Sequence, residues 1–467
     1  MALRRWLALI VVAGLPALAG CGVARAEEPP GLRTRLEAAG IRFTLSYYGD
    51  LFDDPSGGVE QGAGYDGRLG LIVDADLGKL AGWSGARLHA SVHQIHGSQF
   101  SASHLDNLST VSGIEAPPST RLFNLWIEQD LGSHASLRVG QFTAAQEFLI
   151  SQNANLFVNS TFGWPVLTAQ DLPSGGPAYP EATPGARLAF TPNDQLSVRA
   201  AIFNGDPAGP GAGNPVERDP SGLAFRVKDP PLLIAELAYA YHQEKAASSP
   251  ENPHQEGMGA RARPSRRPGA AGLVGLPGTV KLGAWVHTGR FADQRFDAQG
   301  GLLAASGGPA LRHAGNFGIY GVMDQMLWRA PGGGDRGASA FLRMAGAPGD
   351  RNPVDLYADG GFDFKGPCAS RPDDTLGLGL AFVRISPRAA AHDRDVAALA
   401  GTPTPVRDFE AAIELTYQLR LAAGWTVQPD LQHIMHPGGN VPAPTGASGR
   451  SPIRNATVLG LRTMLSF

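Results

Sequence analysis

Arginine, carboxylate, amide and indole side chains recur at every second position of short apolar segments in this chain. In the first such segment, Arg42 and Thr44 alternate with the apolar Phe43 and Leu45. An arginine fork or a carboxylate can exchange hydrogen bonds with adjacent hydroxyl groups, and an aromatic ring can cover the apolar face of a sugar ring. These residue types therefore suit recognition of hydroxylated solutes, although charged side chains also serve simply to solvate a water-filled interior.

The polar positions of these segments form the candidate binding surface, because successive side chains of a strand point to opposite faces. On strands the candidates are Arg42, Arg68, Arg87, Asn124, Trp126, Glu128, Arg187, Lys281, Trp285, Glu414, Asp430 and Arg462. The opposite faces carry Phe43, Leu45, Phe123, Leu125, Ile127, Leu415, Tyr417 and Leu419. The apolar set is expected to face lipid and the polar set to line a channel.

Sixteen alternating segments follow one another, separated by turn-forming Gly, Pro, Asn and Asp residues. They begin near Ile41, Asp66, Gly85, Thr120, Ala135, Gly185, Gln195, Leu232, Thr279, Gly315, Gly337, Val354, Thr375, Arg407, Gly424 and Asn455. Single-chain bacterial barrels have an even number of antiparallel strands. The sequence therefore predicts an all-β fold, a 16-stranded antiparallel transmembrane β-barrel over residues 41–467.

The links between these segments alternate between short and long, as expected for turns on the periplasmic side and loops on the outside. The longest candidate loop, Thr143 to Pro184, is rich in apolar and amide residues, and it contributes Asn155, Asn159, Trp164 and Asp171 to the candidate site. This loop either forms a selective constriction or packs merely to narrow the pore. The apolar stretch Leu223 to Val227 resembles a further strand, but counting it would reverse the alternation, so it is assigned to the approach of the eighth strand.

One predicted periplasmic link breaks the rule of short turns. Residues 244–278 are long and rich in Pro, Ala and Arg, including ARARPSRRPG. This composition predicts a flexible insertion.

Both ends of the chain indicate export to an outer membrane. Arg4 and Arg5 precede an apolar run and small residues, so residues 1–26 are predicted to be a signal peptide, although lipidation of Cys21 is an alternative. Residues 27–40 form a periplasmic segment in which the spacing of Leu32, Leu36 and Gly40 predicts a short helix. The last strand alternates apolar residues and ends on Phe467, which is typical of the closing strand of such barrels, and outer-membrane assembly machinery is an expected partner.

Composition and motifs exclude several other functions. The formal charge of -3 gives no nucleic-acid footprint, and beyond the signal no apolar run is long enough for a spanning helix. His93 and His96, like His433 and His436, are three positions apart in strands and so point to opposite faces, which leaves no expected metal site. No cofactor or enzyme activity is expected, because phosphate-loop, H-E-x-x-H and G-x-S-x-G motifs do not occur in the sequence.

Several stretches together resemble the OprB-type carbohydrate-selective porins of bacterial outer membranes. They are LPGTVKLGAW, HTGRF, RHAGNFGIYGVMDQMLWR, APGDRN, DTLGLGLAFVRIS, WTVQPDLQHIMHPGG and LGLRTMLSF, with FVNSTFGWP and GPAYPEATPGARL earlier in the chain. The resemblance covers about Gly40 to Phe467. It implies passive, carbohydrate-selective diffusion of monosaccharides or small oligosaccharides through a monomeric barrel embedded in outer-membrane lipid. The insertion departs from the family's usual short turn.

Two alternatives remain open on sequence grounds. A purely solvating interior would also suit a general porin for other small solutes. An exported, water-soluble all-β sugar-binding protein is the other alternative, and it would be extracted without detergent, whereas the outward apolar residues predict that detergent is required.

Overall fold

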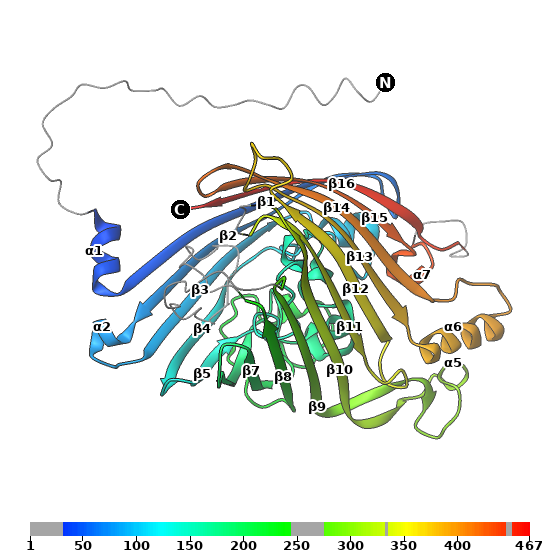
Figure 1. Cartoon of the computed structure of the whole chain (residues 1–467). Coiled ribbons are helices and arrows are strands. Elements are labelled where there is room, and N and C mark those ends of the chain that lie inside the picture. Colours follow the sequence, from blue (N-terminus) through cyan, green and yellow to red (C-terminus); the bar gives the residue numbers. More distant parts are fainter. Residues whose placement is uncertain (1–30, 244–274, 332–334, 445–450) are drawn as a thin grey trace, which may run out of the picture.

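The computed structural model describes residues 31–243, 275–331, 335–444 and 451–467. The described chain forms one closed antiparallel barrel, in which consecutive strands pair and β16 closes on β1 (Figure 1). The strands are β1 (Ile41–Gly58), β2 (Gly62–Asp76), β3 (Ala86–Gly97), β4 (Ser119–Leu131), β5 (Ala135–Phe142), β6 (Thr183–Phe190), β7 (Leu196–Asn204), β8 (Pro231–Tyr241), β9 (Gly278–Asp297), β10 (Ala310–Arg329), β11 (Gly337–Gly346), β12 (Val354–Lys365), β13 (Thr375–Ile385), β14 (Phe409–Ala422), β15 (Trp425–Met435) and β16 (Arg454–Ser466). The predicted all-β class and strand number are confirmed.

Short helices lie in the links and before the first strand. α1 (Leu32–Ala39) ends at Gly40, whose φ of 95° is left-handed, so the predicted helix and its glycine cap are confirmed. The others are α2 (Leu77–Ala81), α3 (Val166–Asp171), α4 (Pro215–Arg218), α5 (Leu303–Ser306), α6 (Pro387–Ala400) and α7 (Pro437–Asn440). No helix in the described part of the chain is long and apolar enough to cross a membrane.

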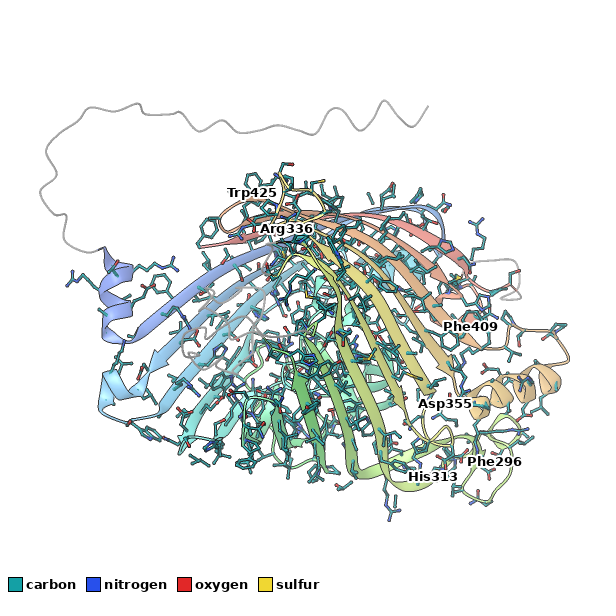
Figure 2. The ribbon with its side chains drawn as sticks, viewed as in Figure 1. Phe296, His313, Arg336, Asp355, Phe409 and Trp425 are labelled. Atoms are coloured by element: carbon teal, nitrogen blue, oxygen red, sulfur yellow. The ribbon has the colours of Figure 1, made fainter. Side chains whose placement is uncertain are left out.

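The two ends of the barrel differ in the length of their links. The end with α1, α2 and the C-terminus carries short links such as 132–134 and 423–424, and we call it the short-turn end (Figure 1). The opposite end, which carries α5, α6 and α7, is the long-loop end. In Figure 2, Phe296 and His313 lie near the long-loop end, and Trp425 and Arg336 lie away from it. The predicted signal peptide, Cys21 and most of the predicted insertion lie outside the described residues.

Side chains alternate along the strands as the sequence predicted. On β16, Leu459 and Leu461 are 43% and 45% exposed, whereas Arg462 between Leu461 and Thr463 is 9% exposed. The exposed set forms the apolar outer surface of the barrel, and the covered set points inside.

The predicted outward position of Phe123 is wrong. Phe123 is 2% exposed and lies inside the barrel, where its ring stacks on His93 at 4.5 Å between centroids. The register of β3 and β4 shifts here, since Ser91 pairs with Asn124 and Val92 pairs with Leu122. Phe123 is therefore the extra residue of a β-bulge, and a bulge redirects the side chain that simple alternation would place outside.

Two predicted strand starts also fall inside longer strands. β2 begins at Gly62 rather than at Asp66, and β10 begins at Ala310 rather than at Gly315. Gly315 has a φ of 73° and lies at a register shift between Ala314 and Asn316. The predicted start of the strand therefore lies at a bulge in the ladder between β9 and β10.

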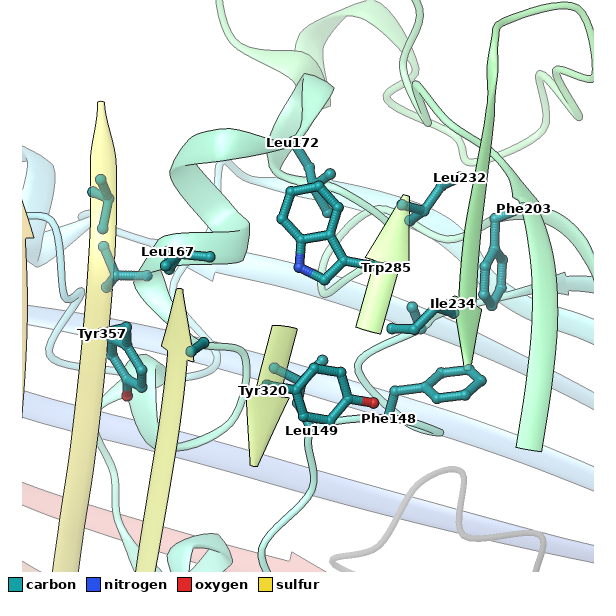
Figure 3. Close-up of a cluster of buried hydrophobic side chains, with 14 of the residues drawn as sticks. Phe148, Leu149, Leu167, Leu172, Phe203, Leu232, Ile234, Trp285, Tyr320 and Tyr357 are labelled. Carbon is teal, nitrogen blue, oxygen red and sulfur yellow. The ribbon is translucent and has the colours of Figure 1, made fainter. Parts of the chain in front are cut away.

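A large apolar cluster lies inside the barrel rather than outside it (Figure 3). Residues of the link between β5 and β6, including Phe148, Leu149, Leu167 and Leu172, pack against inward side chains of the wall. The wall contributes Phe203, Leu232, Ile234, Trp285, Tyr320 and Tyr357. The link therefore folds into the barrel and fills part of its interior.

A buried ion pair joins the first and last strands where the barrel closes. Arg462 on β16 donates from Nε and Nη2 to the two carboxylate oxygens of Asp50 on β1, at 2.8 and 2.7 Å. Ser112, from the link between β3 and β4, donates to the same carboxylate at 2.6 Å. One fully buried carboxylate thus joins the two closing strands to each other and to this link.

We expect Arg462→Met to destabilise the barrel, because it leaves the buried Asp50 carboxylate without its cation. Removing one partner of a buried pair costs about 3–5 kcal/mol, whereas removing both often costs much less. The double variant Asp50→Asn/Arg462→Met should therefore recover part of the loss. Urea unfolding in detergent micelles measures both variants, and a single variant as stable as the wild type would contradict the assignment.

Candidate functional site

Two links fold from the long-loop end into the barrel interior. We call residues 98–118, between β3 and β4, the first inner loop, and residues 143–182, between β5 and β6, the second inner loop. The first inner loop is fastened by Glu410 on β14, whose carboxylate accepts hydrogen bonds from the backbone N–H groups of Leu108 and Ser109, each at 2.7 Å. A third N–H, from Gly438 in α7, reaches the same carboxylate at 2.8 Å.

Glu414, four residues further along β14 and on the same face, fastens the second inner loop. Its carboxylate accepts the backbone N–H groups of Val158 at 2.6 Å and Asn159 at 3.0 Å. The Asn159 amide then donates to the carbonyl of Ser109 at 3.0 Å and to Gln432 at 2.9 Å. Asn159 therefore ties the two inner loops to each other and to β15.

Two more wall carboxylates hold the second inner loop from the opposite side of the barrel. Asp324 on β10 accepts from the Ser151 hydroxyl and from the Gln152 N–H, the latter at 3.2 Å. Glu236 on β8 accepts the Leu149 N–H at 3.1 Å. Buried backbone N–H groups require hydrogen-bond partners. Each carboxylate supplies such a partner to loop donors that lie outside any strand ladder.

Cations of the wall bind the carbonyl groups of the same loop. Arg343 on β11 donates to the carbonyls of Leu149, Thr161 and Gly163, at distances of 3.0, 2.9 and 2.9 Å. Lys281 on β9 donates from Nζ to the Ile150 carbonyl at 2.6 Å. The wall thus offers anions to N–H groups and cations to carbonyls along one continuous segment.

Two glycines of β13 make room for aromatic side chains of the second inner loop. A Cβ at Gly377 would lie 2.5 Å from Leu156, and one at Gly379 would lie 2.7 Å from Phe162 and 2.8 Å from Phe157. Phe157 and Phe162 belong to one buried apolar cluster with Phe341 and Ala381. The glycine-rich stretch from Gly377 to Leu380 is therefore part of a strand, as predicted, and its small inward residues form a seat for the loop.

A cluster of buried charges lies where the second inner loop leaves β5. Glu128 on β4 accepts from Arg138 at 2.6 and 2.9 Å, from Arg187 at 2.9 Å and from Arg87 at 3.0 Å. Glu147, in the loop, pairs with Arg138 at 2.6 Å and with Arg187 at 3.2 Å. Two carboxylates shared among three guanidinium groups hold the start of the loop against the wall.

Aromatic rings lie against cations and histidine in this part of the interior. The Arg138 guanidinium lies 3.6 Å from the centre of the Trp126 ring, and His89 stacks on the same ring at 4.7 Å. Arg68 lies 4.6 Å from the ring of Tyr48 and 5.6 Å from that of Tyr179, in the second inner loop. These contacts fix the rings of Trp126 and Tyr179 at the interior surface.

The predicted candidates divide by their exposure. Arg42 and Arg87 keep 49% and 26% of their side-chain surface exposed, Asn155 is exposed and Trp164 is half-buried. The other candidates are buried inside the barrel: Arg68, Asn124, Trp126, Glu128, Asn159, Asp171, Arg187, Lys281, Trp285, Glu414, Asp430 and Arg462. The structure thus brings most of the candidates together between the wall and the inner loops.

Two further candidates lie in the packed interior, Asp171 within the second inner loop and Trp285 on β9. Asp171 accepts the Val354 N–H at 3.3 Å, and burial raises the pKa of this carboxyl well above its ordinary range. Trp285 is 2% exposed, and its indole packs directly on Gly318. A Cβ atom at position 318 would lie only 2.6 Å from the ring. Both residues contact the packed interior.

The histidine pair of β3 points to opposite faces, as its spacing predicted. His93 is fully buried inside, whereas His96 bonds to the outward Tyr47 hydroxyl at 3.1 Å. Within the described ranges, no group of three or more His, Cys, Asp or Glu side chains could hold a metal ion.

Several of the residues that hold the loops were not among the sequence candidates. Glu236 and Arg343 each stand between apolar neighbours in a strand, and Asp324 follows Met323, so this pattern could have marked them as inward charges. Glu147 lies in a loop, where no periodicity distinguishes it. Its role follows only from the folded geometry.

We expect Glu410→Gln to loosen the first inner loop. An amide offers one acceptor oxygen where the carboxylate offers two, and it presents its own N–H₂ group to backbone donors, so a cost of about 1–3 kcal/mol is expected. Single-channel recording should show a larger and noisier conductance. Glu37→Gln on α1, with a side chain 46% exposed, is the matched control and should behave as the wild type. An unchanged conductance in Glu410→Gln would refute the role of this carboxylate.

The glycine seat allows a separate test. Gly379→Ala places a Cβ against Phe157 and Phe162 and should displace the second inner loop, whereas Gly321→Ala on β10 meets nothing closer than 3.6 Å. We expect altered conductance and a lower unfolding midpoint for the first variant only. Equal behaviour of the two variants would show that the seat is not required.

Comparison with known proteins agrees with this geometry. Residues 60–467 match the family described as "Carbohydrate-selective porin, OprB family". Porin B of Pseudomonas aeruginosa is 25% identical over 439 residues, which cover 88% of this chain and 86% of that protein. A high-pH structure of OprB from Pseudomonas putida superimposes with a TM-score of 0.76 at 23% identity, covering 94% and 96% of the two chains. A low-pH structure of the same protein gives a TM-score of 0.53 at 18% identity, covering 93% and 95%.

The match to the family spans nearly all strands of the barrel, and the solved OprB structures share its fold. This chain therefore belongs to the OprB family of carbohydrate-selective porins, which are β-barrels of the bacterial outer membrane.

Proposed function

We propose that this chain forms a passive channel that selects monosaccharides or small oligosaccharides by means of its two inner loops. The observation that carries the proposal is that both loops are fastened across the interior by wall charges, from which we infer that they form a fixed constriction. No energy source is needed, since transport through such a site requires only weak, multiple contacts that allow release.

The exposed candidates are proposed to contact the solute. Arg42 and Arg87 can donate to sugar hydroxyls, the Asn155 amide can donate and accept, and the Trp164 indole can cover an apolar ring face. The Trp164 Nε1 donates to the Gly175 carbonyl at 3.0 Å, which fixes the orientation of the indole. Weak contacts from several such groups would favour sugars over other solutes of similar size.

The buried candidates are proposed to act indirectly. Glu128, Asn159, Arg187, Lys281 and Glu414 bond to the inner loops or to charges beside them, and so they determine where the loops stand. Their substitution should change the shape of the constriction rather than remove a single sugar contact.

Two further features of the proposal concern assembly. We propose a monomer, which the resemblance to the family implies, and closure between β1 and β16 leaves no strand edge of the barrel open for pairing with a second copy. The assembly machinery of the outer membrane is the proposed partner of β16, whose following residue, Phe467, is 62% exposed. In this arrangement the short-turn end would face the periplasm and the long-loop end the outside.

The proposal predicts that sugars reduce the ion current saturably in a planar bilayer, whereas a polyethylene glycol of similar size does not. For Trp164→Ala, the half-blocking concentrations of glucose and maltose should rise about fivefold, which corresponds to the loss of about 1 kcal/mol of ring contact. Trp425→Ala, at an outward position that is 43% exposed, is the matched control.

The competing reading is a general porin for other small solutes. It predicts a current that responds equally to sugars and to the polymer. It also predicts that Trp164→Ala and Trp425→Ala are indistinguishable in sugar block.

A further inference from the structure

An apolar segment without regular secondary structure lies outside the strand ladder just before β8, and its Phe225 has a left-handed φ of 45°. We call residues 221–228 the rim segment. Leu223, Phe225 and Val227 alternate along it and are 58%, 41% and 77% exposed. Soluble surfaces rarely expose such large side chains in a row, so the rim segment marks a contact surface.

The rim segment is fixed at both ends to the barrel wall. At its start, the Leu122 N–H of β4 donates to the Ser221 carbonyl at 2.9 Å, and Gln141 of β5 donates from its amide to the Gly222 carbonyl at 2.7 Å. Just past its end, the Asp229 N–H donates to Asn204, the last residue of β7, at 3.0 Å. The segment therefore runs from β4 to β7 across the ends of the strands between them.

A salt bridge stiffens the end of the segment. Arg226 donates from Nε and Nη2 to the two carboxylate oxygens of Asp229, at 2.9 and 2.7 Å. This hydrogen-bonded pair lowers the pKa of Asp229, so the bridge persists at any pH above the ordinary range for aspartate. Lys228 beside it is exposed.

The strands of the barrel wall next to the rim segment are short. β5 and β6 have 8 residues each and β7 has 9, whereas β9 and β10 have 20. At a rise of about 3.3 Å per residue and a tilt of about 40°, eight residues cover about 20 Å of membrane thickness, against an apolar band of about 25 Å for such barrels. The shortfall of about 5 Å is close to the spacing of adjacent strands, about 4.8 Å, which is the width of one extended chain.

The exposed apolar band of the barrel continues into this segment. Val139 on β5, Leu188 on β6 and Ile202 on β7 are 51%, 48% and 46% exposed on the lipid face. The rim segment lies beyond the ends of these strands on the long-loop side. Its three apolar side chains supply the next row of the band.

We propose that the rim segment completes the lipid-facing belt above β5, β6 and β7, with Leu223, Phe225 and Val227 inserted among the acyl chains of the outer leaflet. The backbone of the segment forms no strand, and unpaired backbone is costly in hydrocarbon, so the segment lies at the boundary with the lipid headgroups. Lys228 then faces the anionic headgroups.

The test uses single cysteines in a Cys21→Ser/Cys368→Ser background, labelled with bimane and reconstituted in phospholipid vesicles that contain nitroxide-labelled lipid. Phe225→Cys is the test position. Ile319→Cys on β10, at a position 66% exposed on the lipid face, is the lipid control, and Leu399→Cys in α6, at a position 59% exposed in a loop, is the water control.

We expect the label at position 225 to be quenched by nitroxide lipid at least half as strongly as the label at 319, and weakly by aqueous iodide. Quenching equal to that at position 399 would overturn the proposal. Protection from both quenchers, with disulfide-linked dimers of Phe225→Cys, would also overturn it, because a second copy of the chain would then cover the segment.

Discussion

A chain segment that crosses the inside of a wide barrel must find partners for its backbone polar groups away from any strand ladder. In this porin the wall supplies them as buried charges, with Glu410 and Glu414 accepting N–H groups and Arg343 and Lys281 donating to carbonyls. The same charges would be costly to bury alone, because an isolated ion loses its hydration. Loop and wall therefore satisfy each other, and the position of the inner loops follows from this exchange.

Because the loops depend on buried charges of the wall, the polar side chains of the interior have two roles. In the proposed function, charges that are fully covered hold the loops, and candidates that keep some exposure contact the permeating solute. Selectivity would then arise from a few accessible groups, such as Arg42 and Trp164, placed by a larger number of hidden ones. The apolar cluster of Figure 3 adds packing to this framework, since Leu167 and Leu172 of the loop belong to the same cluster as Trp285 of the wall.

Most of the barrel could be predicted because strand periodicity is local. Alternation at Phe43, Leu45, Leu459 and Leu461 is a property of adjacent residues, and each turn follows its own strand. It failed at Phe123 and at Gly315, where bulges break the period of two. The site was less accessible to prediction, because Glu414 meets Val158 across most of the sequence and Glu147 acts from a loop with no repeating pattern.

Hydrogen exchange of the loop amides, followed by mass spectrometry or NMR on the protein in nanodiscs, tests the central claim most directly. If wall carboxylates hold the inner loops, the N–H groups of Leu108, Ser109, Leu149, Val158 and Asn159 should exchange as slowly as those of the neighbouring strands. Protection should extend to these amides although they belong to no strand. Exchange at the rate of exposed loops would contradict the account, since it would mean that the charges of the wall do not fix the constriction.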